Sequence, residues 1–416
     1  MPRFLLQFDP TAGPQLLQQL QALAVPLAFP RPLFDYFVVD LPGAMTGPLA
    51  TLPGELAVRL AALPGVLRVE ADKRMGVFPM PVSQELQGIL TGGPLGLPNP
   101  LNLVGAMALR PDTWPTGESR KVVGADVADA DGITGKGVKV AVLDTGVDPS
   151  HPQLLGIVGE SMIKAQPLAW DENGHSTHVA STLAGSSFSH PQGTLLGVAP
   201  GAELIIIKVL GAGIGLGDWS DILAGMQRAA DLGAKVISMS LGGDDNADPD
   251  SSEFRVVRQL TERGIISCIA AGNSGPGAQT IGSPGSSPDA LTIGAVGKSA
   301  LADFSSRGPT LLGLTKPDAT APGVDILSGS TGIIAAYRFI DGAGRFAAIS
   351  GTSMACPHAS GVLALAEEYI RRRGGTLTTE MVKAALARYY AREPDNEVGY
   401  GLITYPILKR YIDEAF

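Results

Sequence analysis

Short apolar runs alternate with longer stretches of helical periodicity over most of the chain after residue 120. The runs are rich in Val, Ile, Leu and Ala, which is typical of strands buried on both faces of a parallel sheet. The longer stretches repeat apolar residues at the spacing of an amphipathic helix. We therefore expect an α/β fold with a mainly parallel sheet and helices on both of its faces. The predicted strands cover residues 138–144, 204–210, 236–241, 265–271 and 291–296, and the predicted helices cover 220–232, 252–263, 354–372 and 379–392.

The first 80 residues carry a different pattern, which predicts a small α+β domain. Strand candidates cover residues 3–8, 34–41 and 66–70, and leucines at helical spacing lie between them. Gly and Pro then dominate residues 91–100, as in a linker. We expect three parts: a domain over residues 1–80, a linker over 81–120 and a large domain over 121–416.

Candidate catalytic residues lie where predicted strands or loops meet helices. Asp144 ends the predicted strand 138–144, at the edge where open α/β sheets build their sites. His175 lies in the segment NGHSTHVA, at the start of a short helix. Ser353 lies in GTSMACPH, ahead of an apolar helix whose first N–H groups favour a nearby negative charge. Serine, histidine and aspartate are the nucleophile, the base and the orienting group of a catalytic triad.

In this order along the chain, the three motifs resemble those of subtilases, the subtilisin-like serine proteases. A fourth motif, AAGNSG at residues 270–275, matches as well, and the resemblance covers residues 135–402. Ser176 stands where the family usually has Gly, which removes no catalytic group. The resemblance implies the following roles: nucleophile Ser353, base His175, orienting acid Asp144, and Asn273 as the side-chain donor to the oxyanion.

Two other side chains compete for these roles. His178 lies three residues after His175 on the same helical face, but we expect it to be packed and hydrogen-bonded one turn deeper. Cys356 is a rival nucleophile, which the motif disfavours because it assigns that role to Ser353. Cys268 and Cys356 are the two cysteines of the chain. We expect them to be free thiols, although a bridge between them stays open.

The resemblance also implies a cleft in which two backbone segments hold an extended peptide as an added strand. An uncharged pocket there predicts a preference for medium to large apolar residues before the scissile bond. A core position is the alternative for Trp219, which would otherwise line an outer pocket. The residues expected to bind substrate are Gly215, Leu216, Gly217, Trp219, Ser240, Leu241, Gly242 and Gly282.

By pattern and position, residues 1–80 resemble the inhibitory propeptide of subtilases, and their end could lie in the cleft as a strand. The chain's own N-terminal domain is thus an expected intramolecular inhibitor. We expect activation cleavage between residues 73 and 113. The bonds after Phe78 and Met80 are disfavoured because proline follows each of them. Met75–Gly76 is a candidate; the alternative for the whole domain is an unrelated module.

Metal binding is open. No cofactor is required for the chemistry, but many subtilases bind structural calcium. Gln153 stands where the family's first site has a carboxylate, which makes that site doubtful. A second candidate offers oxygens at alternate positions, as hard cations require, although a solvated acidic loop is an equal alternative. Its residues are Asp244, Asn246, Asp248 and Asp250.

Composition limits the function further. The chain has 416 residues, of which 45% are hydrophobic and 17% charged. The net charge of −9 argues against a nucleic-acid partner, and no apolar run reaches the ~20 residues of a membrane span. The first ten residues lack the apolar core of a signal peptide. We expect an intracellular chain, or a secreted one whose leader is outside this sequence, and a monomer that acts on proteins or peptides.

The sequence as a whole predicts a serine endopeptidase that is made as a zymogen and works through an acyl-enzyme. Two alternatives stay open. One is an esterase or transpeptidase that uses the same acyl-enzyme, and the other is a catalytically silent binding scaffold.

Overall fold

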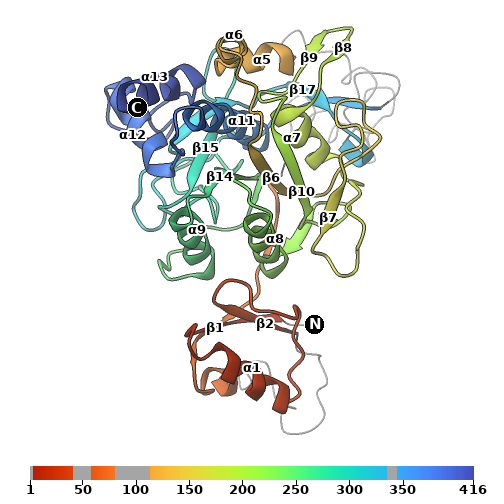
Figure 1. Ribbon diagram of the computed structural model, residues 1–416, viewed down its shortest axis with the longest axis vertical. Coiled ribbons are helices and arrows are strands. Elements are labelled where there is room, and N and C mark those ends of the chain that lie inside the picture. Colours follow the sequence, from red (N-terminus) through yellow and green to blue (C-terminus); the bar gives the residue numbers. More distant parts are fainter. Residues whose placement is uncertain (1–2, 41–57, 80–112, 335–343) are drawn as a thin grey trace, which may run out of the picture.

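The computed structural model describes residues 3–40, 58–79, 113–334 and 344–416, and within them a seven-stranded sheet forms the centre of the large domain (Figure 1). Each pair of neighbouring strands in this sheet is parallel. The strands, in spatial order, are β16 (Ala319–Pro322), β15 (Leu291–Val296), β14 (Ile266–Ala270), β12 (Val236–Met239), β6 (Lys139–Asp144), β10 (Glu203–Lys208) and β7 (Gly159–Ser161). The expected α/β fold class is confirmed.

Helices cover both faces of this sheet. The sequence of β6 shows why, because its apolar side chains pack against helices on both sides. Val140 and Val142 point into one buried cluster, which also holds the helices α7 (His175–Ala184) and α11 (Thr352–Arg371). Ala141 and Leu143 point into the other, with α8 (Trp219–Asp231) and α9 (Ser252–Glu262). Alternate residues of a strand face opposite sides, so an unbroken apolar run satisfies both layers.

Further elements surround the central sheet (Figure 1). Two short sheets pair β17 (Ile326–Gly329) with β18 (Phe346–Ile349) and β5 (Trp114–Pro115), and β8 (Phe188–His190) with β9 (Gly193–Leu195). Further helices are α5 (Thr116–Val122), α6 (Ala125–Ala130), α12 (Thr379–Tyr390) and α13 (Tyr405–Ala415). In the described part of the chain, no helix is both long and apolar enough to cross a bilayer.

The N-terminal residues form a separate antiparallel sheet in the order β2 (Tyr36–Asp40), β1 (Arg3–Phe8) and β3 (Val66–Ala71). Its two faces are buried differently. Phe4, Leu6 and Phe8 pack in a cluster with α1 (Gly13–Ala22), whereas Leu5 belongs to the cluster of the large domain that contains α8 and α9. The sheet therefore lies between its own helix and the surface of the large domain.

Two carboxylates of the N-terminal residues reach the starts of the helices α8 and α9, which lie next to this sheet in Figure 1. Asp72 accepts bonds from the backbone N–H of Ser220 at 2.9 Å and from its hydroxyl at 2.5 Å. Glu70 accepts from the hydroxyl of Ser252 at 2.8 Å. Unpaired N–H groups and the helix dipole both favour a negative charge at a helix N-terminus. These contacts fix how the sheet docks.

Element boundaries differ from the prediction at one instructive place. The linker was expected to extend to residue 120, but β5 and α5 already belong to the large domain. Arg120 of α5 is buried and binds Asp129 at 2.6 Å and the carbonyl of Gly197 at 2.9 Å. The helix is held by these polar contacts and has no apolar stripe, so hydrophobic periodicity gave no signal for it.

Candidate active site

Asp144 and His175 are in direct contact at the carboxyl edge of the sheet. Asp144 is the last residue of β6 and is fully buried. Nδ1 of His175 donates toward both of its carboxylate oxygens, at 2.9 and 3.0 Å. The backbone N–H of Thr145 donates to the same carboxylate at 2.7 Å. The buried carboxylate thus has its partners, and it fixes the tautomer of His175 with the proton on Nδ1.

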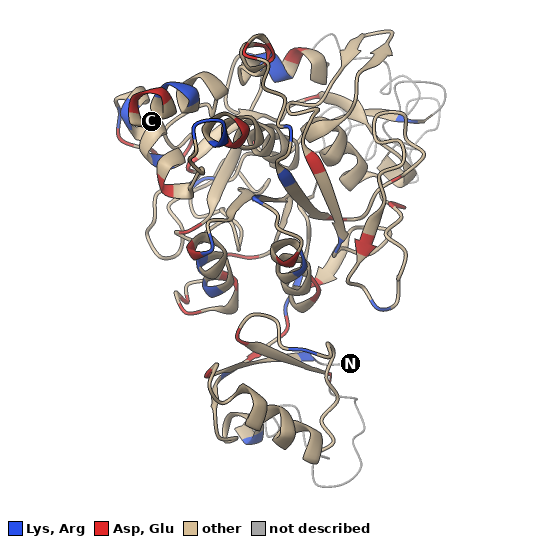
Figure 2. Ribbon diagram, viewed as in Figure 1, with Lys and Arg blue, Asp and Glu red and all other residues tan. Residues whose placement is uncertain are grey.

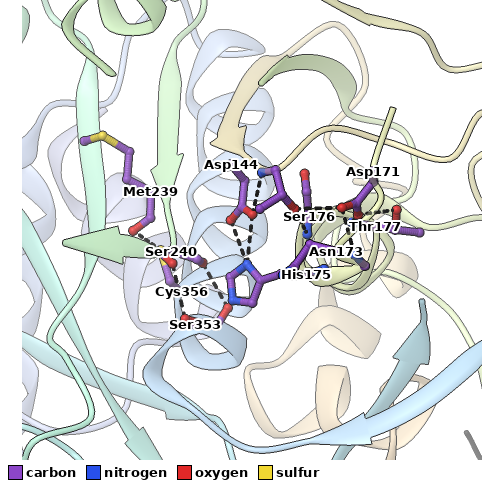
Figure 3. Close-up of polar contacts among 12 residues, drawn as sticks. Asp144, Asp171, Asn173, His175, Ser176, Thr177, Met239, Ser240, Ser353 and Cys356 are labelled. Carbon is purple, nitrogen blue, oxygen red and sulfur yellow. Dashed lines mark hydrogen bonds and ion pairs between the residues drawn. The ribbon is translucent and has the colours of Figure 1, made fainter. Parts of the chain in front are cut away.

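Ser353 lies on the other side of the His175 ring, at the start of α11 (Figure 3). The Nε2 atom of His175 is buried and makes no hydrogen bond within the described residues, and Figure 3 shows the ring between Asp144 and Ser353. The Ser353 hydroxyl donates to the carbonyl of Ser240 at 3.3 Å. The Ser240 hydroxyl in turn donates to the Ser353 carbonyl at 2.9 Å. Nε2 is therefore available to accept a proton.

Asp171, which the sequence analysis did not single out, organises the loop before His175. Its carboxylate accepts from the backbone N–H of Gly174 at 2.8 Å, from both donors of Thr177 at 2.7 Å, and from the Thr145 hydroxyl at 2.8 Å. The contacts with Thr177 and Thr145 tie the start of α7 to the end of β6, where His175 and Asp144 lie. An acidic residue shortly before a helix is a capping signal, but sequence alone does not distinguish this carboxylate from an ordinary cap.

The three histidines near the site differ in the direction in which their surroundings shift the pKa of the imidazole. Burial opposes protonation of His175, but the charge and hydrogen bond of Asp144, with a further contribution from Asp171, outweigh it and raise the pKa of the imidazole. Burial lowers the pKa of His178 to about 3, and that of His358 to about 4. His178 also binds the carbonyls of Ile326 and Ala347 through Nε2, at 3.0 and 3.2 Å. His178 is thus neutral and structural.

Asn273 presents its amide nitrogen to the cleft. Its Oδ1 accepts from the backbone N–H and the hydroxyl of Thr352, both at 2.9 Å, and this leaves Nδ2 on the opposite side. Nδ2 donates at 3.0 Å to the carbonyl of Pro79, a residue of the N-terminal part of the chain. The side chain is therefore a fixed donor that already binds a peptide carbonyl.

The expected cleft segments hold a strand of the chain itself. β4 (Arg74–Val77) lies between β11 (Leu216–Asp218) and β13 (Leu241–Gly242), and both pairings are antiparallel. Gly76 lies opposite Leu216 on one side and Gly242 on the other, and the Val77 N–H donates to the Gly215 carbonyl at 3.0 Å. The candidate bond Met75–Gly76 thus lies inside β4, paired on both sides.

Met75 of β4 lies where the sequence predicted an outer apolar pocket. Met75 belongs to the same buried cluster as Trp219, Ile222 and Leu241. Trp219 is 1% exposed and donates through Nε1 to the Ser252 hydroxyl at 3.0 Å, so it is both a core residue and part of this wall.

Phe78 lies among three glycines of the cleft. A Cβ added to Gly242, Gly282 or Gly272 would lie 2.5, 3.1 or 3.4 Å from its ring. The ring therefore occupies space that exists because side chains are missing there. A remaining pocket of ≈ 520 Å³ is lined by the same strand and by residues 242–245 and 279–282.

Comparison with known proteins agrees with this geometry. The model of the Subtilase family matches residues 135–401. The chain belongs to the subtilase family. Serine protease AprX of Bacillus subtilis is 39% identical over 281 residues, which span 61% of this chain and 61% of AprX. Subtilisin Savinase of Lederbergia lenta is 39% identical over 254 residues, or 61% of this chain and 84% of that protein.

A third relative, the major intracellular serine protease of Bacillus subtilis, is 36% identical over 262 residues, or 61% of this chain and 75% of that protein. The chain thus matches less than two thirds of the length of AprX. In each comparison about three fifths of this subtilase is aligned, which leaves the remainder to be interpreted from its own structure.

The loop proposed for calcium does not fit a metal site in this subtilase. The carboxylate of Asp248 forms an ion pair with Arg68 of β3 and accepts from the N–H of Asp250 at 3.0 Å. The amide oxygen of Asn246 accepts from the N–H of Asp248 at 3.0 Å. Over the ranges that the structure describes, no group of three or more His, Cys, Asp or Glu side chains is arranged to hold a metal.

Gln153, which stands where the family's first calcium site has a carboxylate, is bound to the backbone at both ends of its side-chain amide. Gln153 donates through Nε2 to the carbonyl of Ser186 at 3.1 Å and accepts the N–H of Gly329 through Oε1 at 3.1 Å. An amide with both ends bound to the backbone replaces the carboxylate that a cation would need there.

The two cysteines of this subtilase lie close to Ser353, beneath the start of α11. Both are free and fully buried, and their sulfur atoms are 3.9 Å apart. Cys356 follows Ser353 on α11, but its thiol faces the sheet and contacts the carbonyl of Cys268 at 3.3 Å. Burial raises the pKa of Cys268 well above its usual range. Neither thiol is placed to act in the cleft.

Proposed function

We propose that this chain is a serine endopeptidase with Ser353 as nucleophile. The Ser353 oxygen attacks the carbonyl carbon of a peptide while Nε2 of His175 takes its proton. His175 then gives the proton to the leaving nitrogen as the C–N bond breaks, which leaves an acyl-enzyme. A water molecule repeats the sequence and releases the acid. The buried Asp144 stabilises the imidazolium that forms in both steps.

The oxyanion of each tetrahedral intermediate is bound by Nδ2 of Asn273 and the backbone N–H of Ser353. Preorganisation supports this role: Thr352 already holds the Asn273 oxygen away from the cleft, so the donor needs no reorientation during the reaction. The observation that carries the proposal is the buried Nε2 of His175, which has no hydrogen-bond partner among the described residues. The His175 ring has Asp144 on one side and Ser353 on the other.

A peptide is the substrate that the cleft favours over a simple ester. The two segments around β4 pair with a backbone on both sides and over several residues, and an isolated ester offers no such N–H and C=O groups. The glycine-lined pocket around Phe78 is uncharged, which supports a preference for large apolar residues before the scissile bond. Met75, four positions from the bond after Phe78, supports an apolar preference in the outer pocket.

We further propose that residues 1–80 are an inhibitory domain and that the chain is made as a zymogen, with the linker and catalytic domain following. Three contacts support this: β4 fills the cleft, the Pro79 carbonyl takes the oxyanion donor, and the carboxylates of Asp72 and Glu70 bind the helices beside the cleft. No substrate can pair with the cleft segments while β4 lies between them.

A direct test compares peptide and ester substrates with the same apolar side chain, with and without an added amine. An endopeptidase hydrolyses internal bonds of a long peptide and reacts with a serine-directed phosphonate at Ser353. Transfer of the acyl group mainly to the amine indicates a transpeptidase. Cleavage of esters alone indicates an esterase. A fully folded chain that takes no phosphonate label, even after its N-terminal residues are removed by digestion, is a silent scaffold.

A further inference from the structure

Phe78 sets the register in which the N-terminal segment lies in the cleft. Its ring lies against Gly242 and Gly282, in the pocket proposed above for the residue before the scissile bond. A peptide substrate seated in the same way has its fifth residue before that bond at the place of Arg74 and its sixth at the place of Lys73. Each of these two basic residues meets a carboxylate of the catalytic domain.

Arg74 forms an ion pair with Asp218, the residue that directly precedes α8. The two residues lie opposite each other in the antiparallel pairing of β4 with β11, and Nη1 of Arg74 donates to Oδ1 of Asp218 at 2.7 Å. Side chains at opposite positions of paired strands are close enough to interact. Any peptide that adds to β11 in this register therefore presents its fifth residue to Asp218.

Lys73 reaches a second carboxylate, that of Glu253 in the first turn of α9. Its Nζ lies 2.7 Å from Oε1 of Glu253, whose side chain is 1% exposed. The Lys73 carbonyl accepts the N–H of Trp219 at 2.7 Å, so the main chain is still bound to the cleft at this residue. A carboxylate that is buried when the outer cleft is filled needs a cation beside it, and a bound substrate can supply one.

Asp218 and Glu253 share a second property, because each lies at the start of a helix. The positive end of the helix dipole favours a negative charge at such a position. Figure 2 shows acidic and basic residues together where the N-terminal domain meets α8 and α9. The outer end of the cleft thus differs from the pocket around Phe78, which is uncharged.

We propose that Asp218 and Glu253 select peptide substrates that carry Lys or Arg at the fifth and sixth positions before the scissile bond. This inference rests on the proposed peptidase function and narrows its substrate class to a basic pair followed by an apolar stretch. Residues 73–78, with the sequence KRMGVF, have this pattern. The two ion pairs lie far from the reacting atoms and are made equally in the ground state and the transition state, so they act on KM and leave kcat unchanged.

The test puts two peptides in competition for the full chain at low ionic strength. Both have Met-Gly-Val-Phe before the bond and Ala-Ser after it, and they differ only in a preceding Lys-Arg or Ala-Ala pair. The ratio of their initial rates is the ratio of their kcat/KM values, and it does not depend on how many molecules have an open cleft. An exposed ion pair changes an equilibrium by up to about 5-fold, so we expect the Lys-Arg peptide to be preferred about 10-fold. The preference should shrink in about 0.5 M salt.

Variants of the two carboxylates test the contacts one at a time. Asp218→Asn and Glu253→Gln should each lower the ratio about 3-fold. Asp218→Lys should reverse the preference at the fifth position, so that Glu is favoured over Arg there. Asp231→Asn is the matched control, because it removes one negative charge from the far end of α8, where Asp231 accepts from Gln227 at 2.7 Å. The control should keep the ratio of the unaltered chain.

A ratio close to 1 for the unaltered chain, with both peptides cut after Phe, would overturn the inference and restrict the two ion pairs to docking of the N-terminal domain. A ratio that Asp231→Asn lowers as much as Asp218→Asn would also overturn it, because the net charge of the enzyme would then attract basic peptides without a defined contact. Hydrolysis of neither peptide, even after digestion of the N-terminal residues, would instead remove the proposed peptidase function itself.

Discussion

Thr352 holds the side chain of Asn273 by two hydrogen bonds to a single atom, Oδ1, each 2.9 Å long. Because Thr352 directly precedes Ser353, the residue next to the proposed nucleophile also orients the proposed oxyanion donor. The Thr352 hydroxyl in addition accepts from the N–H of Gly272 at 3.1 Å. Asn273 and Ser353, the proposed donor and nucleophile, are thus linked through Thr352.

Thr352→Val should therefore impair turnover more than substrate binding. The substitution keeps the shape but removes the hydroxyl, so Asn273 loses one of two restraints. We expect kcat to fall about 10-fold, the worth of one buried hydrogen bond, with little change in KM. Thr352→Ser is the matched control and should stay close to the unaltered enzyme. A change confined to KM would show that Thr352 supports the cleft and does not orient the donor.

Asn273→Ala should also lower kcat with little change in KM, and by more than Thr352→Val does. Loss of an oxyanion donor lowers kcat by ~10²–10³, a magnitude known from subtilisin, which is a member of the same family. Steady-state kinetics on a peptide with Phe before the bond would measure it. Asn273 would be misassigned if KM rose and kcat were unchanged.

Ser353→Ala should abolish peptide hydrolysis and any self-cleavage while the chain still folds. For subtilisin the corresponding loss is ~10⁶ in turnover, and we borrow that size for this chain. Circular dichroism and intact mass of the purified variant would separate loss of chemistry from loss of structure. Self-cleavage that persists in the pure variant would exclude Ser353 as the nucleophile.

The pH dependence should reflect His175. The base must be neutral to accept a proton, so kcat falls as the pH drops through the pKa of His175. Because Asp144 raises that pKa above the ordinary value of 6.5, the midpoint of the acidic limb should lie above pH 6.5. Asp171→Asn removes a second charge that raises the pKa, and it should move the midpoint to lower pH. An unshifted midpoint with lower kcat would mean that Asp171 acts through loop geometry alone.

Docking of the N-terminal domain can be weakened without altering the cleft. Asp72→Ala removes a carboxylate from the start of α8, where capping interactions are worth about 1 kcal/mol. We expect basal peptide hydrolysis by the intact chain to rise roughly 5-fold, since a larger fraction of molecules is open. Asp9→Ala is the control, because the Asp9 carboxylate accepts from Thr11 within its own domain. Equal activity of both variants would contradict inhibition by docking.

The sequence was sufficient to predict the strands that are buried on both faces of the sheet. It did not predict the hydrogen bonds that depend on the conformation of loops. The strand ending at Asp144 is an apolar run, and its partners at His175 and Ser353 follow short motifs, so pattern and resemblance were enough to find them. Asp171 accepts hydrogen bonds from nearby N–H and hydroxyl groups, and Thr352 donates its own N–H and hydroxyl to Oδ1 of Asn273. No periodicity in the sequence marks such contacts. The register of β4 against the two cleft segments is likewise set by contacts distant in the sequence.

The alternation of β6 has a consequence for how this fold tolerates change. Val140 and Leu143 face opposite layers, so deletion of a single residue between them would exchange inside for outside along the rest of the strand. Asp144 would then turn away from the imidazole even if each remaining side chain stayed apolar. Insertions or deletions within this strand are therefore restricted by the number of residues they add or remove. An even number keeps the Asp144 carboxylate directed toward His175, and an odd number turns it to the opposite face of the sheet.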